Sequence, residues 1–549
     1  MDFFPLLPGY SRIQIEPHPK WENLCVGGNV RAIIRLVVAC SLLLLAVASV
    51  TPVRAQSVSF PTLQDRITLA TDWLLDYQGY NFTTVDDLGK TLVYLSDLRQ
   101  VLPGQFSVDA TMSQLISLML AHETFNSTFS YLDPYGRFIS EDFGWWNAFA
   151  AEAIAVSAAR MLSNPQLDPS SRILYLNATE IVERMIGKWA PVFAQADGSW
   201  RFGYPFTGQD NSLDANAMML TALTVLASYE QVRGDPNHQL TQLTRWASGI
   251  AEWIMSRQEK RLLWLRGGFY NDGTNQTMYT DSNARAVFAL ITYADQIKSL
   301  TSNGSSIRNQ VLAALQFWTN FIPYSTYAPT SSFGMRDQYD YGPYWYVTKC
   351  SSSPSSLEVG VNGTVYDQSS GLCFFRYPKE TWRAAVVGRA LLGMYNLTAN
   401  ADLVLRAIYY YGWMTGINEL QMDLQQIVGH TQAMAVPFGG LIPPGRGGFW
   451  IGIKRTGWTP NASHVTTSLM PSHAPLESTV ESADFLIRLL DKWTGHSWIF
   501  EAMPYTPLNT QQMILDHSVK FEDYGARITM AMTVTLPQRE HNLIIQRLT

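Results

Sequence analysis

The sequence lacks the basic character that a nucleic-acid partner would select. Charged residues make up 15% of the 549 positions, below the usual quarter, and the net charge is −6. We find no run of like charges. Binding to a polyphosphate backbone requires a basic patch or stripe. Nucleic-acid binding is therefore excluded as an expectation.

The common catalytic signatures are also missing. There is no Gly-x-Ser-x-Gly elbow, no His-Glu-x-x-His, no phosphate loop and no dinucleotide fingerprint. The histidines that follow the first sixty residues are scattered from His122 to His541, without ligand spacing. We therefore expect neither a metal ion nor an organic cofactor.

Cysteine is scarce, with four residues in the whole chain. Cys25 and Cys40 lie in or before an N-terminal targeting segment, which leaves Cys350 and Cys373. In an oxidising compartment these two are expected to pair, closing a loop worth about 3 kcal/mol of unfolded-state entropy. Two cysteines alone would not complete a metal site.

Long apolar runs are lacking except for one, from Leu36 to Val50. Arg31 and Arg35 precede it, and Val53-Arg54-Ala55 resembles a signal-peptidase site, so residues 1–55 are interpreted as a targeting segment. The run is short for a membrane span, which favours a cleaved signal peptide. An uncleaved signal anchor stays open, because the stretch before it is long. Either alternative places the remainder outside the cell or in the secretory pathway, with membrane contact only through that anchor.

Asparagine sequons agree with export. Eight Asn-x-Ser/Thr sites occur along the chain, none with proline in the middle. They are Asn81, Asn126, Asn177, Asn275, Asn303, Asn362, Asn396 and Asn461. We expect a glycosylated surface.

A repeat organises most of the chain. "DANAMMLTAL" at 214–223 and "DSNARAVFAL" at 281–290 share Asp-x-Asn-Ala followed by Ala-Leu, and weaker copies start at 145 and 382. Each copy opens an alanine-rich segment that is apolar nearly all round, as expected of a helix buried on most faces. A more amphipathic segment follows each. The repeat therefore predicts helical hairpins, each with an inner buried helix and an outer half-exposed one, which must stack to bury their faces.

The loop before each inner helix is rich in aromatic residues and glycine, as in "DGSWRFGYPFTGQDNSL". This combination resembles the (α/α) toroid class, which includes six-hairpin glycosidases, related polysaccharide lyases and epimerases, and terpene cyclases. The resemblance implies an all-α toroid of about five or six hairpins over residues 56–500, with a disulfide-containing insertion at about 323–380. No aspartate cluster of the terpene cyclase type is found. Residues 501–549 and the Gly/Pro-rich stretch before them predict a small closing element of the toroid or a small β cap.

Asp214 and Asp281 hold the same rank in adjacent hairpins, near the expected mouth of the toroid. Glycoside hydrolysis needs two carboxylates, about 5 Å apart for retention or roughly 6.5 to 9.5 Å for inversion. Inner helices packed roughly 8 to 10 Å apart could supply the larger spacing. The alternative is that both aspartates are helix N-caps. Asn216 and Asn283 could bind substrate or bond to neighbouring loops.

Other candidates gather near the same mouth. In the insertion, Asp337 and Asp340 are further acid candidates, and Tyr341 and Trp345 could stack on a sugar; a loop packed onto the barrel is the alternative. The remaining aromatic candidates for substrate binding are Trp145, Trp146, Trp200, Tyr204 and Trp382. Glu141, Asp142 and Glu380 are spare acids.

Together these features favour a secreted enzyme that acts on a carbohydrate, most simply a glycoside hydrolase of poly- or oligosaccharides. A non-catalytic glycan-binding or cell-surface scaffold protein is the alternative, with carboxylates that cap helices. A polysaccharide lyase or epimerase is a second alternative, for which Tyr341, Tyr344 and His430 are candidates.

Overall fold

The computed structural model describes about half of the chain, all of it within a compact unit that starts at Pro61. The described residues are 63–76, 85–121, 145–201, 212–236, 238–262, 265–271, 277–318, 346–350, 365–367, 371–375, 379–400, 403–404, 407, 410–411, 414, 448–449, 452–457, 466–470, 475–495, 520–522 and 527–529. The predicted targeting segment 1–55 lies outside them. Among the described helices, none combines the length and apolar character needed to cross a membrane.

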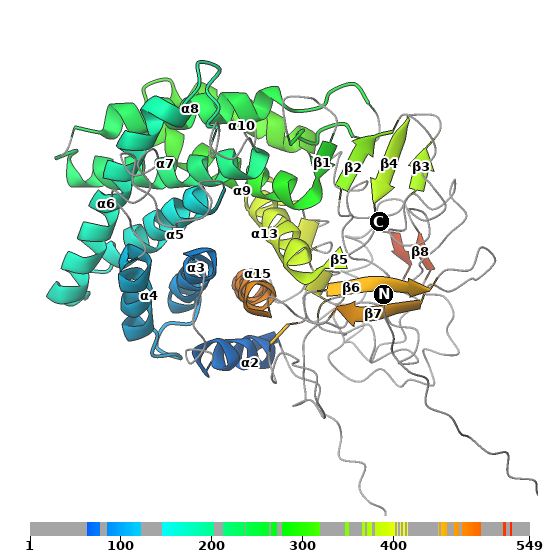
Figure 1. Ribbon diagram of the computed structural model, residues 1–549, viewed down its shortest axis with the longest axis horizontal. Helices are drawn as coiled ribbons and strands as arrows, with labels where there is room; N and C mark the ends of the chain where they lie inside the picture. Colours follow the sequence, from blue (N-terminus) through cyan, green and yellow to red (C-terminus); the bar gives the residue numbers. More distant parts are fainter. Residues whose placement is uncertain are drawn as a thin grey trace, which may run out of the picture. The chain divides into compact units, whose positions relative to one another are not determined.

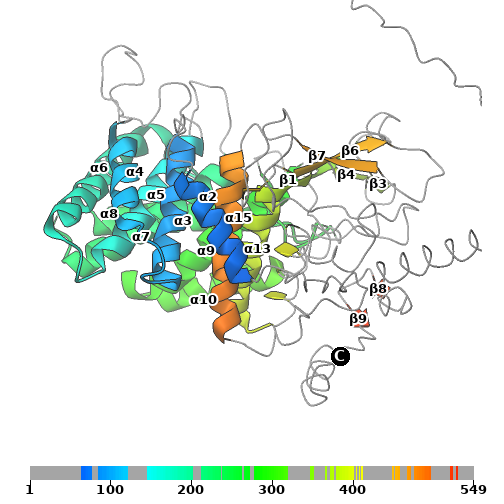
Figure 2. The ribbon, with the colours of Figure 1, turned by 90° about the horizontal axis from the view of Figure 1, so that it is seen from below.

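Six helices form a closed inner ring (Figures 1 and 2). Each packs on the next in chain order, and the last packs back on the first. They are α3 (Val85–Val101), α5 (Trp145–Leu162), α7 (Leu213–Arg233), α9 (Thr280–Leu300), α13 (Thr381–Thr398) and α15 (Pro475–Gly495). The ring explains why these segments are apolar on most faces, since each contacts two inner neighbours and one or more outer helices.

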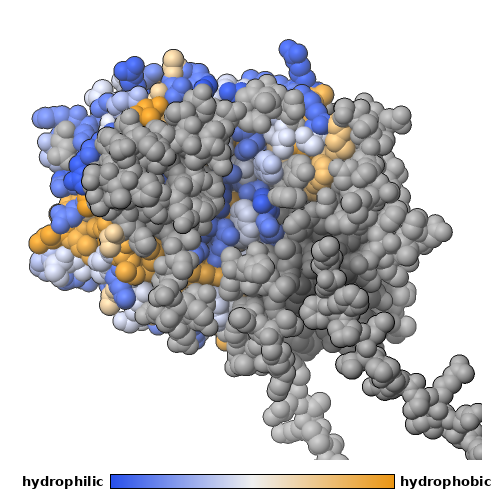
Figure 3. Space-filling model, in the orientation of Figure 1, coloured by the Kyte–Doolittle hydropathy of each residue, from blue (hydrophilic) through white to orange (hydrophobic). Residues whose placement is uncertain are grey.

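A second layer of helices lies outside the ring. α2 (Leu63–Asp76) packs on α15, α4 (Asp109–Ala121) on α3, α6 (Pro169–Phe193) on α5, α8 (Leu240–Ser256) on α7, and α10 (Gly304–Trp318) on α9. An apolar patch lies over α4 and α6, where Leu118 and Ile173 are exposed (Figure 3). The alternation of inner and outer helices confirms the predicted all-α toroid.

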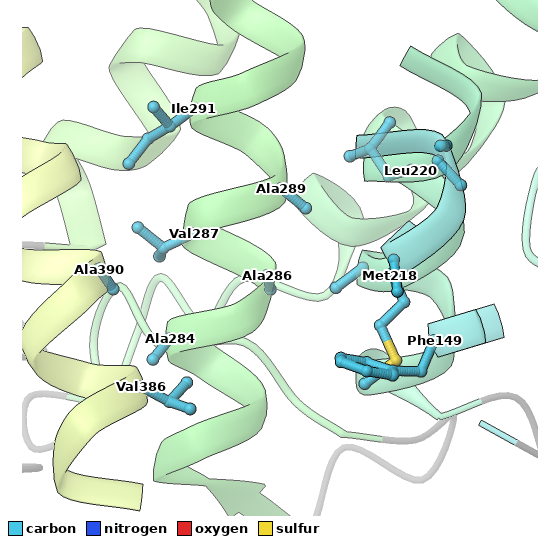
Figure 4. Close-up of a cluster of buried hydrophobic side chains, with 14 of the residues drawn as sticks. Phe149, Met218, Leu220, Ala284, Ala286, Val287, Ala289, Ile291, Val386 and Ala390 are labelled. Atoms are coloured by element: carbon cyan, nitrogen blue, oxygen red, sulfur yellow. The ribbon is translucent and has the colours of Figure 1, made fainter. Parts of the chain in front are cut away.

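Small side chains let the inner helices approach closely. Ala284 and Val287 of α9 face α13, whereas Ala286 and Ala289 face α7 (Figure 4), and all four are buried. A short side chain at a helix contact shortens the distance between the two axes. The alanines that define the repeat therefore set the packing of the ring.

The structure extends the repeat from four copies to six. The two further copies start at Asp86, in α3, and at Glu477, in α15. The α3 copy was not predicted, because Leu88 and Gly89 stand where the stronger copies have asparagine and alanine.

The repeated asparagines are buried clamps, not substrate ligands. Asn216 Oδ1 accepts a hydrogen bond from the backbone N–H of Trp200 (2.7 Å), and its amide donates to the carbonyls of Trp200 (3.1 Å) and Ser212 (2.9 Å). Asn283 repeats this pattern with the N–H of Phe269 (2.6 Å) and the carbonyls of Phe269 and Tyr279 (both 2.9 Å). Both side chains are fully buried, so their expected role in substrate binding is wrong.

The clamps hold the loop that precedes each inner helix. Trp200 and Phe269 each belong to an isolated β-bridge, with Ala194 and Gln258 respectively. In α15 the Thr479 hydroxyl takes the place of the amide and accepts from the N–H of Phe449 (2.8 Å). A polar residue two positions after the start of the repeat therefore fixes the incoming chain at three points of the ring.

Short antiparallel strands occur before the inner helices. One sheet has the order β1-β2-β4-β3, from β1 (Thr277–Tyr279), β2 (Tyr346–Lys349), β4 (Leu372–Phe375) and β3 (Val365–Asp367). It pairs part of the insertion with the strand that leads into α9, with Met278 opposite Val347. The predicted disulfide between Cys350 and Cys373 is confirmed, with a Cα–Cα distance of 5.7 Å. Strands in the insertion were not predicted.

Two further sheets lie later in the chain. β5 (Lys379–Glu380), β6 (Gly452–Gly457) and β7 (Thr466–Met470) form one, and β8 (Lys520–Glu522) pairs with β9 (Arg527–Thr529) in the other. β5 leads directly into α13, as β1 does into α9. The expected β character of the Gly/Pro-rich and C-terminal segments is confirmed for these strands.

The clamps generate a stability prediction. Asn216→Ala and Asn283→Ala would each leave a buried backbone N–H and carbonyl without partners, so each should lower the free energy of unfolding by about 2 to 4 kcal/mol. Urea unfolding followed by circular dichroism measures the change. Gln242→Ala, at an exposed site of α8, is the matched control and should change it by less than about 0.5 kcal/mol. Equal effects of all three substitutions would contradict the clamp.

Candidate active site

The two repeat aspartates are not helix N-caps. The N-cap of α7 is Ser212, whose side chain accepts from the N–H of Ala215, and the N-cap of α9 is Tyr279. Asp214 and Asp281 are each the second residue of their helix. The capping alternative is therefore wrong, although a carboxylate in the first turn still interacts favourably with the helix dipole.

Asp214 connects the two helices and retains one free oxygen. Its Oδ2 accepts a hydrogen bond from the Ser282 hydroxyl of α9 (2.8 Å). Its Oδ1 is buried with no hydrogen-bond partner among the described residues. Burial and then the nearby charge of Asp281 raise the pKa of Asp214 to about 6, with Arg285 opposing them. Asp214 is therefore an acid that holds its proton in mildly acidic solution.

Asp281 has a different environment. It is buried and forms an ion pair with Arg383, the third residue of α13. The Nε of Arg383 also donates to Glu380 Oε2 (2.6 Å). Burial raises the pKa of Glu380, and Arg383 counteracts this. The Arg383 guanidinium thus pairs with two carboxyl groups, those of Asp281 and Glu380.

Trp382 is the one predicted aromatic ligand that lies beside these groups with a described side chain. Its partly exposed ring has Arg383 at 4.3 Å and Arg285 at 5.8 Å from the ring centroid. The Arg383 guanidinium stacks on this indole, and the part of the ring that stays exposed could contact an apolar face of a sugar.

Glu477 belongs to the same group of residues and was missed in the sequence. It occupies in α15 the rank that Asp214 and Asp281 occupy in α7 and α9. Burial alone would raise its pKa, but the Lys90 ammonium, 2.5 Å away, lowers it, as do Arg285 and Arg383. The only signal in the sequence was the rank itself, because the flanking alanines are replaced in this copy.

A cavity of about 420 Å³ lies inside the ring. All six positions four residues after the start of a repeat copy line it, as do all six positions seven residues after it. The first set is Lys90, Phe149, Met218, Arg285, Val386 and Glu481; the second is Val93, Glu152, Thr221, Phe288, Arg389 and Asp484. Neither Asp214 nor Asp281 is among the lining residues. The predicted pair, in the first turns of α7 and α9, therefore lies outside the lining of a cavity that has its own acidic groups.

Ion pairs between helices cross the cavity wall. Glu481 bonds to Arg285 (3.2 Å) and to Arg389 (2.5 Å), and Arg389 also pairs with Asp484. Arg285 links this wall to the two repeat aspartates. The negative charges of Glu481, Asp214 and Asp281 all raise its pKa, against the effect of burial.

Several predicted residues take other places. Trp200 is 1% exposed and packs edge-on against Trp246 at 5.7 Å between ring centroids, so it is a core residue and its expected role at the mouth is wrong. Trp145 and Trp146 begin α5, but their side chains are outside the described part. Tyr204, Asp337, Asp340, Tyr341, Tyr344, Trp345, His430, Glu141 and Asp142 also lie outside the described residues. Among the described residues, no group of three or more His, Cys, Asp or Glu could hold a metal ion.

No family model matches the sequence, and no curated protein matches it. Several solved structures resemble this chain in fold. A glycosyl hydrolase of family 88 from Bacteroides vulgatus has a TM-score of 0.44 at 10% identity, covering 78% of this chain and 99% of that chain. Cellobiose 2-epimerase from Spirochaeta thermophila has a TM-score of 0.45 at 10% identity, covering 80% and 98%. A family 105 glycoside hydrolase from C. acetobutylicum has a TM-score of 0.43 at 12% identity, covering 77% and 98%. The function of this chain is inferred from its own residues.

The environment of Asp214 predicts a pH-dependent stability. Because its pKa is about 6 in the folded chain against 3.8 for an ordinary aspartate, the folded state binds more protons between those values. The free energy of unfolding therefore falls as the pH rises through that window. Asp214→Asn has no such proton to lose. Between about pH 4 and pH 7 its free energy of unfolding should therefore rise by on the order of 1–3 kcal/mol relative to that of the parent. Urea unfolding at both values measures this, and a pH-independent difference would contradict it.

Proposed function

We propose that this protein is an exported carbohydrate-active enzyme, a glycoside hydrolase with Asp214 as general acid and Asp281 as general base. One observation carries the proposal: two electrostatically coupled carboxyl groups lie at the same rank of adjacent inner helices in contrasting environments. An acid and a base that work in one site at one pH need environments that separate their pKa values. Desolvation raises the pKa of Asp214, whereas Asp281 forms an ion pair with Arg383.

The roles follow from the contacts. Asp214 would donate its proton to the oxygen of the leaving sugar, since its raised pKa keeps it protonated and its Oδ1 has no other described partner. The Ser282 hydrogen bond to Oδ2 would orient the carboxyl so that Oδ1 points away from α9. Asp281 would accept the proton of a water molecule, and its ion pair with Arg383 would hold the carboxylate in position. Adjacent helix axes packed roughly 8 to 10 Å apart favour inversion, with water between the carboxylates.

Binding of a sugar next to these carboxyls is supported by Trp382. Its ring is partly exposed, has Arg285 and Arg383 near it, and offers an apolar surface where it is exposed. Such a surface suits the C–H face of a pyranose, while the guanidinium groups can donate to its hydroxyls.

The non-catalytic alternative also has an observation in its favour. Arg383 is already paired with both Asp281 and Glu380, as a structural ion pair would be. A glycan-binding or scaffold protein would keep these pairs and the aromatic ring without turnover. A polysaccharide lyase or epimerase would use other residues, and its candidates Tyr341, Tyr344 and His430 lie outside the described part.

A glycan screen tests the proposal. Hydrolysis releases reducing ends, whereas a lyase also produces the ultraviolet absorbance of unsaturated uronates. Asp214→Asn and Asp281→Asn should each reduce kcat by about 10²- to 10⁴-fold with little change in KM, because each removes a proton-transfer group. The parent should lose activity as the pH rises through about 6, where Asp214 loses its proton.

Asp295→Asn is the matched control, since it changes an exposed aspartate near the other end of α9. It should leave kcat unchanged. Glycan binding without turnover, equal in all variants, would instead support the scaffold alternative.

We infer export and N-glycosylation from the targeting segment and the sequons. Asn177, Asn303 and Asn396 are exposed in the structure, as acceptor sites must be, and the disulfide fits an oxidising compartment. Protein from a secreting eukaryotic host should therefore shift to lower mass on treatment with an N-glycosidase. Asn177→Gln should remove one glycan from the intact mass. An unshifted band from such a host would contradict the inference.

A further inference from the structure

The cavity inside the ring reaches solvent at the end opposite to Asp214 and Asp281. On α7 its lining runs from Ala217 to Val232, and at a rise of about 1.5 Å per residue this spans roughly 22 Å. Ala217 is 1% exposed, whereas Val232 is 87% exposed. Ser163, at the end of α5, also lines the cavity and is exposed. The opening therefore lies at the C-terminal ends of α5 and α7.

The charged side chains that line the cavity form ion pairs, with one exception. Every lysine and arginine in its lining has an ion-pair partner, as do the acids Glu481 and Asp484. Among the charged residues of the described lining, Glu152 alone has no ion pair. It lies on α5, seven residues after the start of its repeat copy.

Glu152 faces charged or polar groups from four other inner helices, α7, α9, α13 and α15. Burial raises the pKa of Glu152 to about 7. The positive charges of Arg285 on α9 and Arg389 on α13 oppose this rise, whereas the negative charge of Glu481 on α15 adds to it. A hydrogen bond from Thr221 on α7 also lowers the pKa. A carboxyl group in this balance can both donate and accept a hydrogen bond near neutral pH.

The wall between Glu152 and the opening combines apolar side chains with two paired arginines, Arg160 and Arg488. Val156, Val225 and Phe288 lie along the wall, and Tyr229 is nearer the opening. At the rim the Ser228 hydroxyl donates to Gln296 Oε1 (3.1 Å). Apolar walls with a few convergent polar groups are typical of small-molecule sites, and about 420 Å³ lies within their usual range.

We propose that this cavity is a second ligand site, entered between the C-terminal ends of α5 and α7, which binds a small neutral sugar through a hydrogen bond to Glu152. A hydroxylated ring combines polar edges for Glu152 and Thr221 with C–H faces for Val225 and Phe288. The site lies inside the ring, apart from Asp214 and Asp281. It does not depend on hydrolysis at those two residues.

Neutrality of the ligand follows from the ion pairs. An anion would have to displace a carboxylate from a paired arginine, which leaves a buried charge without a partner. A cation would meet Arg285 and Arg389 beside Glu152. A neutral hydroxylated ligand meets neither obstacle.

Isothermal titration calorimetry on the mature chain tests the site, with glucose, galactose, mannose and cellobiose as neutral probes and glucuronate as the anionic counterpart. At least one neutral sugar should bind, and glucuronate at least about tenfold more weakly than glucose. Glu152→Ala should weaken the neutral sugar by about tenfold or more, whereas Glu152→Gln, which keeps a donor and an acceptor, should retain it within about threefold.

The entrance is tested separately. Val232→Trp places a large side chain in the opening at an exposed site and should abolish sugar binding, whereas Val232→Ala should preserve it. Asp214→Asn, at the other end, should leave this binding intact, so failure of the hydrolase proposal and failure of this one are distinguishable. No binding of any neutral sugar, tighter binding of glucuronate, or binding unaffected by Glu152→Ala or by Val232→Trp would overturn the proposal.

Discussion

The ring depends on ion pairs between buried carboxylates and partly buried arginines, which join its helices across the hollow centre. Asp97 of α3 pairs with Arg160 of α5 and with Arg488 of α15, and Arg488 bonds to Asp484 (3.3 Å) on its own helix. Through Arg389 and Glu481 the series continues to α13 and α9. A hollow ring of helices cannot fill its axis with alanine and leucine alone, so polar groups there must satisfy one another.

Burial makes the proton balance of this series part of the structure. Burial raises the pKa of Asp97 to about 7 despite its two arginines, whereas Arg488 and Arg389 hold the pKa of Asp484 below its usual range although burial opposes them. Arg285 joins this interior series to Asp214 and Asp281, since it bonds to Glu481 and lies near the charges of the two aspartates.

The sequence could predict the hairpins, because alanine at fixed ranks and an amphipathic partner are local patterns. It also predicted the disulfide, for which only two cysteines were left. It could not assign Asn216 and Asn283, since a buried amide that holds a loop and an exposed amide that binds sugar look identical in sequence. Pairs such as Asp97 with Arg488 are 391 residues apart, and no local pattern connects them. Side chains in the 122–144 and 319–345 segments lie outside the described residues, so their predicted roles stay predictions.

The repeat separates residues that form the ring from residues that are free to vary. Ranks that touch a neighbouring helix hold alanine or another small residue in most copies, because the spacing of the axes requires it. The ranks that line the cavity hold a different residue type in almost every copy, as in Lys90, Phe149, Arg285 and Glu481. Helix packing does not restrict the residue type at those positions. The groups or ligands that lie in the cavity determine which side chains are suitable there. Glu152 is the member of this set whose charge no other described side chain pairs, which is why a ligand is its expected partner.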